Sequence, residues 1–152
     1  LYSCSRRDAA ITPLRVACKL DPDNARAHLA LGETCMHLGF FAEAERASLR
    51  VNVLDPTEVE GYFLQGMACV ELKRDLHVEE ARTHLSDCLR LSPSHEDANY
   101  EMVMLLFNKG DYTAAADHCE QAVKNNPDSD LLLDTLAWVF CFVTPEVKSR
   151  VW

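Results

Sequence analysis

The side chains best suited to metal binding are six histidines and seven cysteines, spread along a chain of 152 residues. None of the histidines lies beside another histidine or a cysteine at the spacings typical of structural zinc sites. His77 with Glu80, and His84 with Cys88, fall on one predicted helix, but such pairs amount to a fortuitous surface site. The sequence therefore predicts no metal and no cofactor.

The cysteines form an odd-numbered set without a C-x-x-C pair, a pattern that favours free thiols in a reducing compartment over disulfides. Cys35 and Cys69 occupy the same place in successive repeats, described below, and are predicted to pack as small apolar groups between helices. A reactive thiol needs electropositive surroundings, and this chain is acidic. We interpret the cysteines as packing residues of an intracellular protein.

Catalysis would require a nucleophile with its base, a glycine loop that cradles phosphate, or two carboxylates in one pocket. The five glycines are scattered, and the pair Glu79 and Glu80 fits the solvated first turn of a helix. We predict that the chain is not an enzyme. The alternative in this class is a regulatory repeat region of a larger enzyme.

The charge balance bears on the partners of the chain. With 15 Lys and Arg against 24 Asp and Glu, the formal net charge is −9. Nucleic acids and anionic lipid surfaces bind clustered cations, so both are disfavoured. The longest apolar stretch, residues 136–143, is far shorter than the roughly 20 residues that span a bilayer. These observations predict a cytoplasmic protein with protein partners, no nucleic acid and no membrane insertion.

Prolines punctuate the chain at nearly constant intervals. Pro22, Pro56, Pro93 and Pro127 follow one another at roughly 34 residues, a period typical of repeats built from two helices. A helix ends before each of them, because proline cannot continue a helix and restricts the residue before it. Gly39 and Gly110 stand at the same distance before the next proline and permit the left-handed conformation of a tight turn between helices.

Between these breaks the apolar residues recur at helical spacing. We predict paired helices at about 24–38 and 42–54, 58–73 and 78–91, and 96–109 and 112–124, with single helices at 3–20 and 129–143. A three-residue insertion falls in 73–77, and Thr144 with Pro145 begins a further helix. The predicted fold class is all-α, a right-handed superhelix of antiparallel helical hairpins.

Three units carry parts of the pattern W-x2-L-G-x2-Y…A-x3-F…P. The matching residues are Leu31, Gly32, Cys35, Ala44 and Pro56, then Gly66, Cys69, Ala81 and Pro93, then Leu106, Tyr112, Ala115, Ala122 and Pro127. His28 and Asn99 replace the first large aromatic residue, and Val103 stands where glycine or alanine is expected. On these residues the chain resembles the tetratricopeptide repeat (TPR) family.

The resemblance implies one TPR array over residues 1–152 that serves as a protein-interaction scaffold. It implies the second helix of a preceding repeat at 1–22, repeats at 23–56, 57–93 and 94–127, and an incomplete repeat at 128–152. The repeat at 57–93 carries the insertion.

In such arrays the first helix of each pair lines a concave groove, whose residues determine the partner. Projecting that helical face predicts ten groove residues: Leu29, Glu33, Met36, Phe63, Met67, Val70, Tyr100, Met104, Phe107 and Trp138. Acidic residues that include Asp97 and Asp134 border this mostly apolar strip. We predict that it binds an amphipathic helix or extended peptide with a basic edge, from other subunits of a large complex. A stripe of this kind is also typical of a packed core, which remains the alternative.

Some members of the TPR family bind chaperones, gripping the terminal carboxylate of a chaperone tail with Lys, Asn and Arg side chains. A co-chaperone adaptor of this kind is the second functional alternative. The predicted groove places Leu29, Glu33 and Phe63 where that clamp has cations and amides. Its acidic border would repel a carboxylate.

A narrower resemblance covers residues 97–128. The residues that carry it are Asp97-Ala98-Asn99, Met102, Leu105, Phe107-Asn108-Lys109-Gly110-Asp111-Tyr112, Ala115, His118, Gln121 and Asn126-Pro127-Asp128. They are similar to a stretch of the TPR-rich subunit of intraflagellar transport complex A. This resemblance implies a scaffold inside the cilium that contacts other transport subunits.

Overall fold

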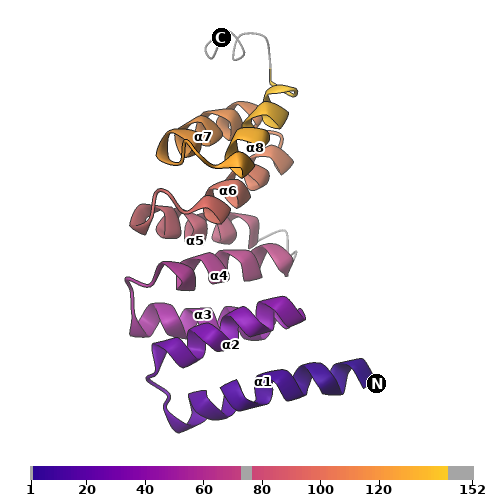
Figure 1. Cartoon of the computed structure of the whole chain (residues 1–152), viewed down its shortest axis with the longest axis vertical. Helices are drawn as coiled ribbons and strands as arrows, with labels where there is room; N and C mark the ends of the chain where they lie inside the picture. Colours follow the sequence, from indigo (N-terminus) through magenta and orange to yellow (C-terminus); the bar gives the residue numbers. More distant parts are fainter. Residues whose placement is uncertain (1, 73–76, 144–152) are drawn as a thin grey trace. The chain divides into compact units, whose positions relative to one another are not determined.

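The computed structural model of the chain describes residues 2–72 and 77–143, and the regular structure in these residues is helical (Figure 1). The chain divides into two compact units, Leu1–His84 and Leu85–Trp152, called here the N-terminal and C-terminal units. No helix in the described ranges is both long enough and apolar enough to cross a membrane.

The N-terminal unit is built mainly from α1 (Tyr2–Leu20), α2 (Ala25–Leu38), α3 (Phe41–Leu54) and α4 (Val59–Glu71). Consecutive helices pack against each other, and α2 also contacts α4. The core between them consists of Ile11, Cys18, Leu31, Cys35, Ala44, Ala47 and Ala68. Most of these side chains are small, so the helix axes can approach closely.

The C-terminal unit contains α6 (Glu96–Asn108), α7 (Tyr112–Asn125) and α8 (Asp130–Phe140), while the boundary between the units lies inside α5 (His77–Leu91). Helix α6 packs on α7, α7 packs on α8, and α6 also contacts α8. The core consists of Val103, Ala115, Ala116, Cys119, Val139, Phe140 and Val143.

Glycine ends two of the helices, as predicted. Gly39 and Gly110 have φ angles of 81° and 84°, in the left-handed region that an L side chain rarely adopts. After α2, the amide of Phe40 donates to the carbonyl of Cys35 at 2.8 Å. After α6, the amide of Asp111 donates to the carbonyl of Leu106 at 3.0 Å. These bonds close both helical hairpins with the same turn.

The loops that contain the prolines share a hydrogen bond. In each of three repeats, the side chain six residues after the proline lies within hydrogen-bond distance of the proline carbonyl. The pairs are His28 with Pro22 at 3.0 Å, Tyr62 with Pro56 at 3.4 Å, and Asn99 with Pro93 at 3.0 Å. These are the positions of the first large aromatic residue of the repeat. A polar replacement there preserves a tie between helix and loop.

The predicted helix bounds agree with the observed ones to within a few residues, except at the end of the last helix. That helix was expected to continue to residue 143 and ends at Phe140. The amides of Cys141 and Phe142 donate to the carbonyls three residues earlier, at 3.0 Å each, which tightens the chain into a turn. Most of the predicted insertion and the predicted helix start at Thr144 lie outside the described residues.

Candidate functional site

The predicted groove residues recur at equivalent places on three helices. They stand at positions i, i+4 and i+7 of α2 (Leu29, Glu33, Met36), of α4 (Phe63, Met67, Val70) and of α6 (Tyr100, Met104, Phe107). This spacing places each trio on one helix face. The tenth residue, Trp138, lies on α8, one repeat further along the chain than Met104.

In the N-terminal unit this face is largely half-buried. Leu29, Met36, Phe63, Met67 and Val70 are all of intermediate exposure, and only Glu33 in this part of the prediction is exposed. Met36 packs against the apolar core of the unit. At Met36, therefore, the face is continuous with the core.

In the C-terminal unit the face encloses a pocket between α6 and α8, with a volume of about 260 Å³. Its walls are Tyr100, Met104, Leu131, Asp134, Thr135 and Trp138. The two α6 residues are one turn apart, and the α8 residues recur at helical spacing along one side of that helix. Three predicted groove residues are thus brought together around one pocket.

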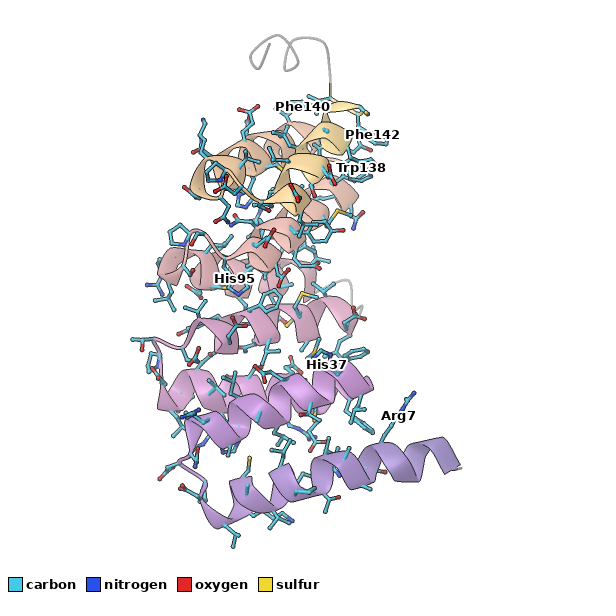
Figure 2. The ribbon with its side chains drawn as sticks, in the orientation of Figure 1. Arg7, His37, His95, Trp138, Phe140 and Phe142 are labelled. Carbon is cyan, nitrogen blue, oxygen red and sulfur yellow. The ribbon has the colours of Figure 1, made fainter. Side chains whose placement is uncertain are left out.

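Beside the pocket, four aromatic rings form a cluster that we call the aromatic cluster: Phe107, Tyr112, Trp138 and Phe142. Phe107 is at its centre, with its ring centroid 4.4 Å from Trp138, 4.8 Å from Tyr112 and 5.0 Å from Phe142. Trp138 of α8 and Phe142 of the turn after it extend to the same side (Figure 2). Tilted and edge-on contacts at these distances are favourable for aromatic pairs.

The cluster is only partly covered. Trp138 is 42% exposed, Phe142 50% and Tyr112 39%, and Leu131 in the adjoining pocket is 38% exposed. Aromatic residues that contact each other and remain open to solvent form an apolar surface of the kind that binds other proteins.

The charge at this surface is negative. Asp134 is exposed and lines the pocket. Thr135, the other polar residue of α8 in the lining, donates its hydroxyl to the carbonyl of Leu131 at 2.6 Å. Over residues 85–143 the chain has ten Asp and Glu against three Lys and Arg. The pocket therefore combines apolar walls with one carboxylate in an acidic region.

The predicted set of ten did not include Tyr112 or Thr135. Tyr112 is the first residue of α7 and reaches Phe107 because the turn at Gly110 folds the chain back on itself. Such a contact across a hairpin does not follow from the periodicity of one helix. Thr135 stands three positions before Trp138, a spacing that could have identified it.

A second pocket, of about 360 Å³, lies in the N-terminal unit at the turn between α2 and α3. It is lined by Gly39, Phe40, Phe41, Ala42, Glu43, Arg46 and Leu72, and the sequence did not indicate it. Glu43 accepts two hydrogen bonds from Arg15 of α1, from Nε at 2.7 Å and from Nη2 at 2.5 Å. This pair holds the pKa of Glu43 below its usual value. The carboxylate of Glu43 in this pocket is thus already neutralised by Arg15 of the same chain.

The buried thiols are unreactive groups of the core, as predicted. Burial raises the pKa of Cys35, Cys69 and Cys119 to about 11, with smaller contributions from Glu43, Glu45 and Glu120 respectively. A thiol with such a pKa stays protonated near neutral pH. Within the described residues, no group of three His, Cys, Asp or Glu side chains could hold a metal ion.

Two family models match the chain. A model described as TPR repeat matches residues 1–39, and one described as tetratricopeptide repeat matches residues 77–139. Together they cover about two thirds of the sequence. The fold is an all-α helical-repeat solenoid. The chain belongs to the tetratricopeptide repeat family.

Solved structures with a similar fold support this assignment. A crystal structure of MamA protein has a TM-score of 0.79 and 21% identity, over 98% of this chain and 79% of its own. TTC0263, a TPR protein of Thermus thermophilus, has a TM-score of 0.71 and 23% identity, over 93% and 76%. The first TPR of Spaghetti (RPAP3), bound to the HSP90 peptide SRMEEVD, has a TM-score of 0.68 and 16% identity, over 77% and 93%. No curated protein matches the chain in sequence.

Proposed function

We propose that this chain is a non-catalytic scaffold for protein interactions, and that the face formed by α6 and α8 binds an apolar helix or peptide of a partner. The observation that carries the proposal is the aromatic cluster, in which Trp138 and Phe142 are exposed beside the pocket. Tryptophan and tyrosine contribute disproportionately to binding energy at protein interfaces. Met104 adds an apolar side chain that adapts to irregular surfaces.

The chemistry of the two pockets supports a role in binding rather than in catalysis. TPR proteins are in general interaction modules without catalytic activity. Thr135 carries the hydroxyl group nearest to Asp134 in sequence, and this hydroxyl donates a hydrogen bond to a backbone carbonyl of its own helix. Glu43 is held in an ion pair by Arg15. Both arrangements are those of structural groups and do not pair a nucleophile with a base.

The half-buried face of α2 and α4 extends the same proposal to the N-terminal unit. One side of α4 is apolar and carries Phe63, Met67 and Val70. On α2 the exposed Glu33 occupies the position that Met67 has on α4. We propose that these residues contact the partner as well. Substitution of Phe63 and Met67 by glutamate should then weaken binding without loss of helical circular dichroism.

A chaperone tail is the second candidate guest, and one observation favours it. Two structures with this fold are RPAP3 domains, one bound to the HSP90 peptide SRMEEVD and the other to the HSP70 peptide SGPTIEEVD. Both peptides end in two glutamates, a valine and an aspartate. The pocket of this chain instead presents the carboxylate of Asp134, which would repel such an end. Titration with SRMEEVD distinguishes the candidates, and we expect no shift of the Trp138 signals.

The resemblance over residues 97–128 supports a finer proposal. The chain would form part of a larger multi-subunit assembly, with intraflagellar transport as the process. Co-purification of the full-length protein from ciliated cells, followed by identification of the other subunits, tests this proposal independently of the groove.

The binding face can be tested with a photo-crosslinker incorporated in place of Phe142 in the full-length protein. We expect crosslinks to one helical segment of a partner, mapped by mass spectrometry on the native assembly. Leu49 is a matched control, because it is 52% exposed but belongs to α3 of the N-terminal unit and not to the aromatic cluster. Crosslinks of equal yield from both positions would contradict the proposal, as would their absence at Phe142.

A further inference from the structure

The α6–α8 pocket has a composition that distinguishes it from a simple apolar groove. Tyr100 and Trp138 supply aromatic walls, and Met104 and Leu131 supply aliphatic ones. A single carboxylate, that of Asp134, is the charged group of the lining. Aromatic walls with one anion match a side chain that has an apolar stem and a cationic end.

Asp134 differs from Glu43 in its partners. Within the part of the chain that the structure describes, the carboxylate of Asp134 makes neither an ion pair nor a hydrogen bond. Glu43, in the other pocket, is by contrast held by two bonds from Arg15. Over residues 85–143 the three basic residues are Arg90, Lys109 and Lys124, and none of them lines the pocket. An approaching cation would thus meet an unneutralised charge.

The size of the pocket favours a single side chain as its guest. At about 260 Å³ it lies below the roughly 300–1,000 Å³ that is usual for sites of small molecules and cofactors. The pocket also adjoins the exposed aromatic cluster, where the rest of a bound segment could lie.

We propose that this pocket receives a lysine or arginine side chain of the partner protein, with its stem against Tyr100 and Met104 and its cation beside Asp134 and Trp138. The inference rests on the proposed binding role of the α6–α8 face and specifies its guest. It makes the basic residue a specificity determinant: a partner helix with glutamine or norleucine at that position should bind less tightly.

The pocket can be tested directly with four small probes, the N-acetyl methylamides of arginine, lysine, glutamine and norleucine. Their binding is followed by NMR through the indole signal of Trp138, assigned with a Trp152→Phe variant. We expect half-saturation by the arginine and lysine probes at concentrations at least about fivefold lower than by the norleucine and glutamine probes. In Asp134→Asn this preference should disappear, and in Asp134→Lys the two cationic probes should bind least of all.

Asp128→Asn is the matched control, because Asp128 is an exposed aspartate just before α8 that does not line the pocket. This variant should retain the preference. The proposal is overturned if norleucine binds as tightly as arginine, or if the preference survives in Asp134→Asn. Circular dichroism of each variant verifies that the helices are intact.

The outcome separates this inference from the proposed function. If Phe142 crosslinks to a partner but the probes show no cation preference, the binding face stands and the basic anchor is wrong. If the cationic probes bind at Trp138 with the expected preference but no partner segment crosslinks at Phe142, the pocket selects cations, and both the binding face and the partner's basic anchor are wrong.

Discussion

The two units use the same repeat position in opposite ways. Gly32 of α2 and Val103 of α6 occupy equivalent places in their repeats. A Cβ atom at Gly32 would lie 3.3 Å from Leu64 Cδ1 and 3.6 Å from Ala47 Cβ, so the neighbouring helices already fill that space. Val103 is fully buried in a core that includes Ala116. At this position the N-terminal unit packs its helices closely because glycine has no side chain, whereas the C-terminal unit fills its core with the side chain of valine.

The polar ties between segments distant in the sequence differ as well. In the N-terminal unit they are ionic: Arg15 binds Glu43, and Arg50 Nη2 lies 2.7 Å from Asp23 Oδ1. In the C-terminal unit the corresponding ties are amides: Asn125 and Asn126 donate to the carbonyls of Pro93 and Ser94, at 3.3 and 2.6 Å. The same architecture can be closed by charges or by neutral hydrogen bonds, and the two should respond differently to pH and salt.

The largest effect is expected from exchanging the residues at the shared position. Val103→Gly removes a fully buried side chain and introduces a helical glycine, which should lower the free energy of unfolding by roughly 2.5–4 kcal/mol. Gly32→Val forces two extra methyl groups against Leu64 and should cost about 1–3 kcal/mol. Urea denaturation followed by circular dichroism measures both.

Val53→Gly is the matched control for Val103→Gly, because Val53 is a helical valine that is 63% exposed. Only the difference in helix propensity between valine and glycine, under about 0.5 kcal/mol, should be lost there. If Val103→Gly lowers the free energy of unfolding no more than this control does, the C-terminal core does not depend on the side chain at position 103.

A second substitution tests which glycine the N-terminal unit requires. A Cβ atom at Gly61 would lie 2.2 Å from Asn52 Oδ1 and 2.9 Å from Val51 Cγ1, both of which must then move. Asn52 Nδ2 also donates to Gln65 Oε1 at 2.6 Å, so the shift disturbs a partly buried bond. Gly61→Ala should therefore cost about 1–3 kcal/mol in urea denaturation.

Gly32→Ala is the comparison for this change. Its closest contact is the flexible end of Leu64, and alanine adds about 1 kcal/mol of helix propensity, so the net change should be under about 1 kcal/mol. If Gly61→Ala and Gly32→Ala lower the free energy of unfolding equally, the close spacing of α3 and α4 at Gly61 has no special role.

The ion pair of Arg15 and Glu43 predicts a pH response in the N-terminal unit. Because Arg15 lowers the folded-state pKa of Glu43, the pair stabilises the fold above the unfolded pKa of about 4.3 and is lost as the pH falls through the lower folded value. Glu43→Gln should lower the urea midpoint at pH 7 and lower it by less at pH 3. Glu33→Gln, at an exposed carboxylate, should change neither midpoint. A loss at pH 3 as large as at pH 7 would show that the charge of Glu43 is not what matters.

The sequence predicted the helices because proline and glycine act locally. The breaks at Pro22 and Gly39 depend on backbone constraints that hold in any context. Asn99 was a departure from the repeat pattern that made packing there harder to predict. The structure explains it through hydrogen bonds: its amide donates to the carbonyls of Pro93 and His95, and its oxygen lies 3.1 Å from His118 Nε2.

The site was harder to predict, because groove and core share one pattern of apolar residues. Periodicity placed Met36 and Met104 on the same face of their helices, but Met36 packs against a core whereas Met104 lines an open pocket. Exposure depends on what the neighbouring helix supplies, as Phe107 shows by contacting Tyr112 across a turn. The pairing of Arg15 with Glu43 joins α1 to α3 and has no local sequence signal.

The smallest effects concern the ties at the loops, and salt distinguishes them. Arg50 and Asp23 are 41% and 80% exposed, so Arg50→Ala should cost no more than about 1 kcal/mol at low salt. In 1 M NaCl the Debye length falls to about 3 Å, and most of that difference should vanish.

Asn126→Ala removes a neutral bond worth roughly 0.5–1.5 kcal/mol, which salt should leave unchanged. Urea midpoints of Arg50→Ala and Asn126→Ala, at low salt and in 1 M NaCl, measure how each loss of stability depends on salt. If the loss in Arg50→Ala persists at high salt, the tie depends on the hydrogen bonds of Arg50 to the Pro22 carbonyl rather than on charge, and the two units are closed in the same way.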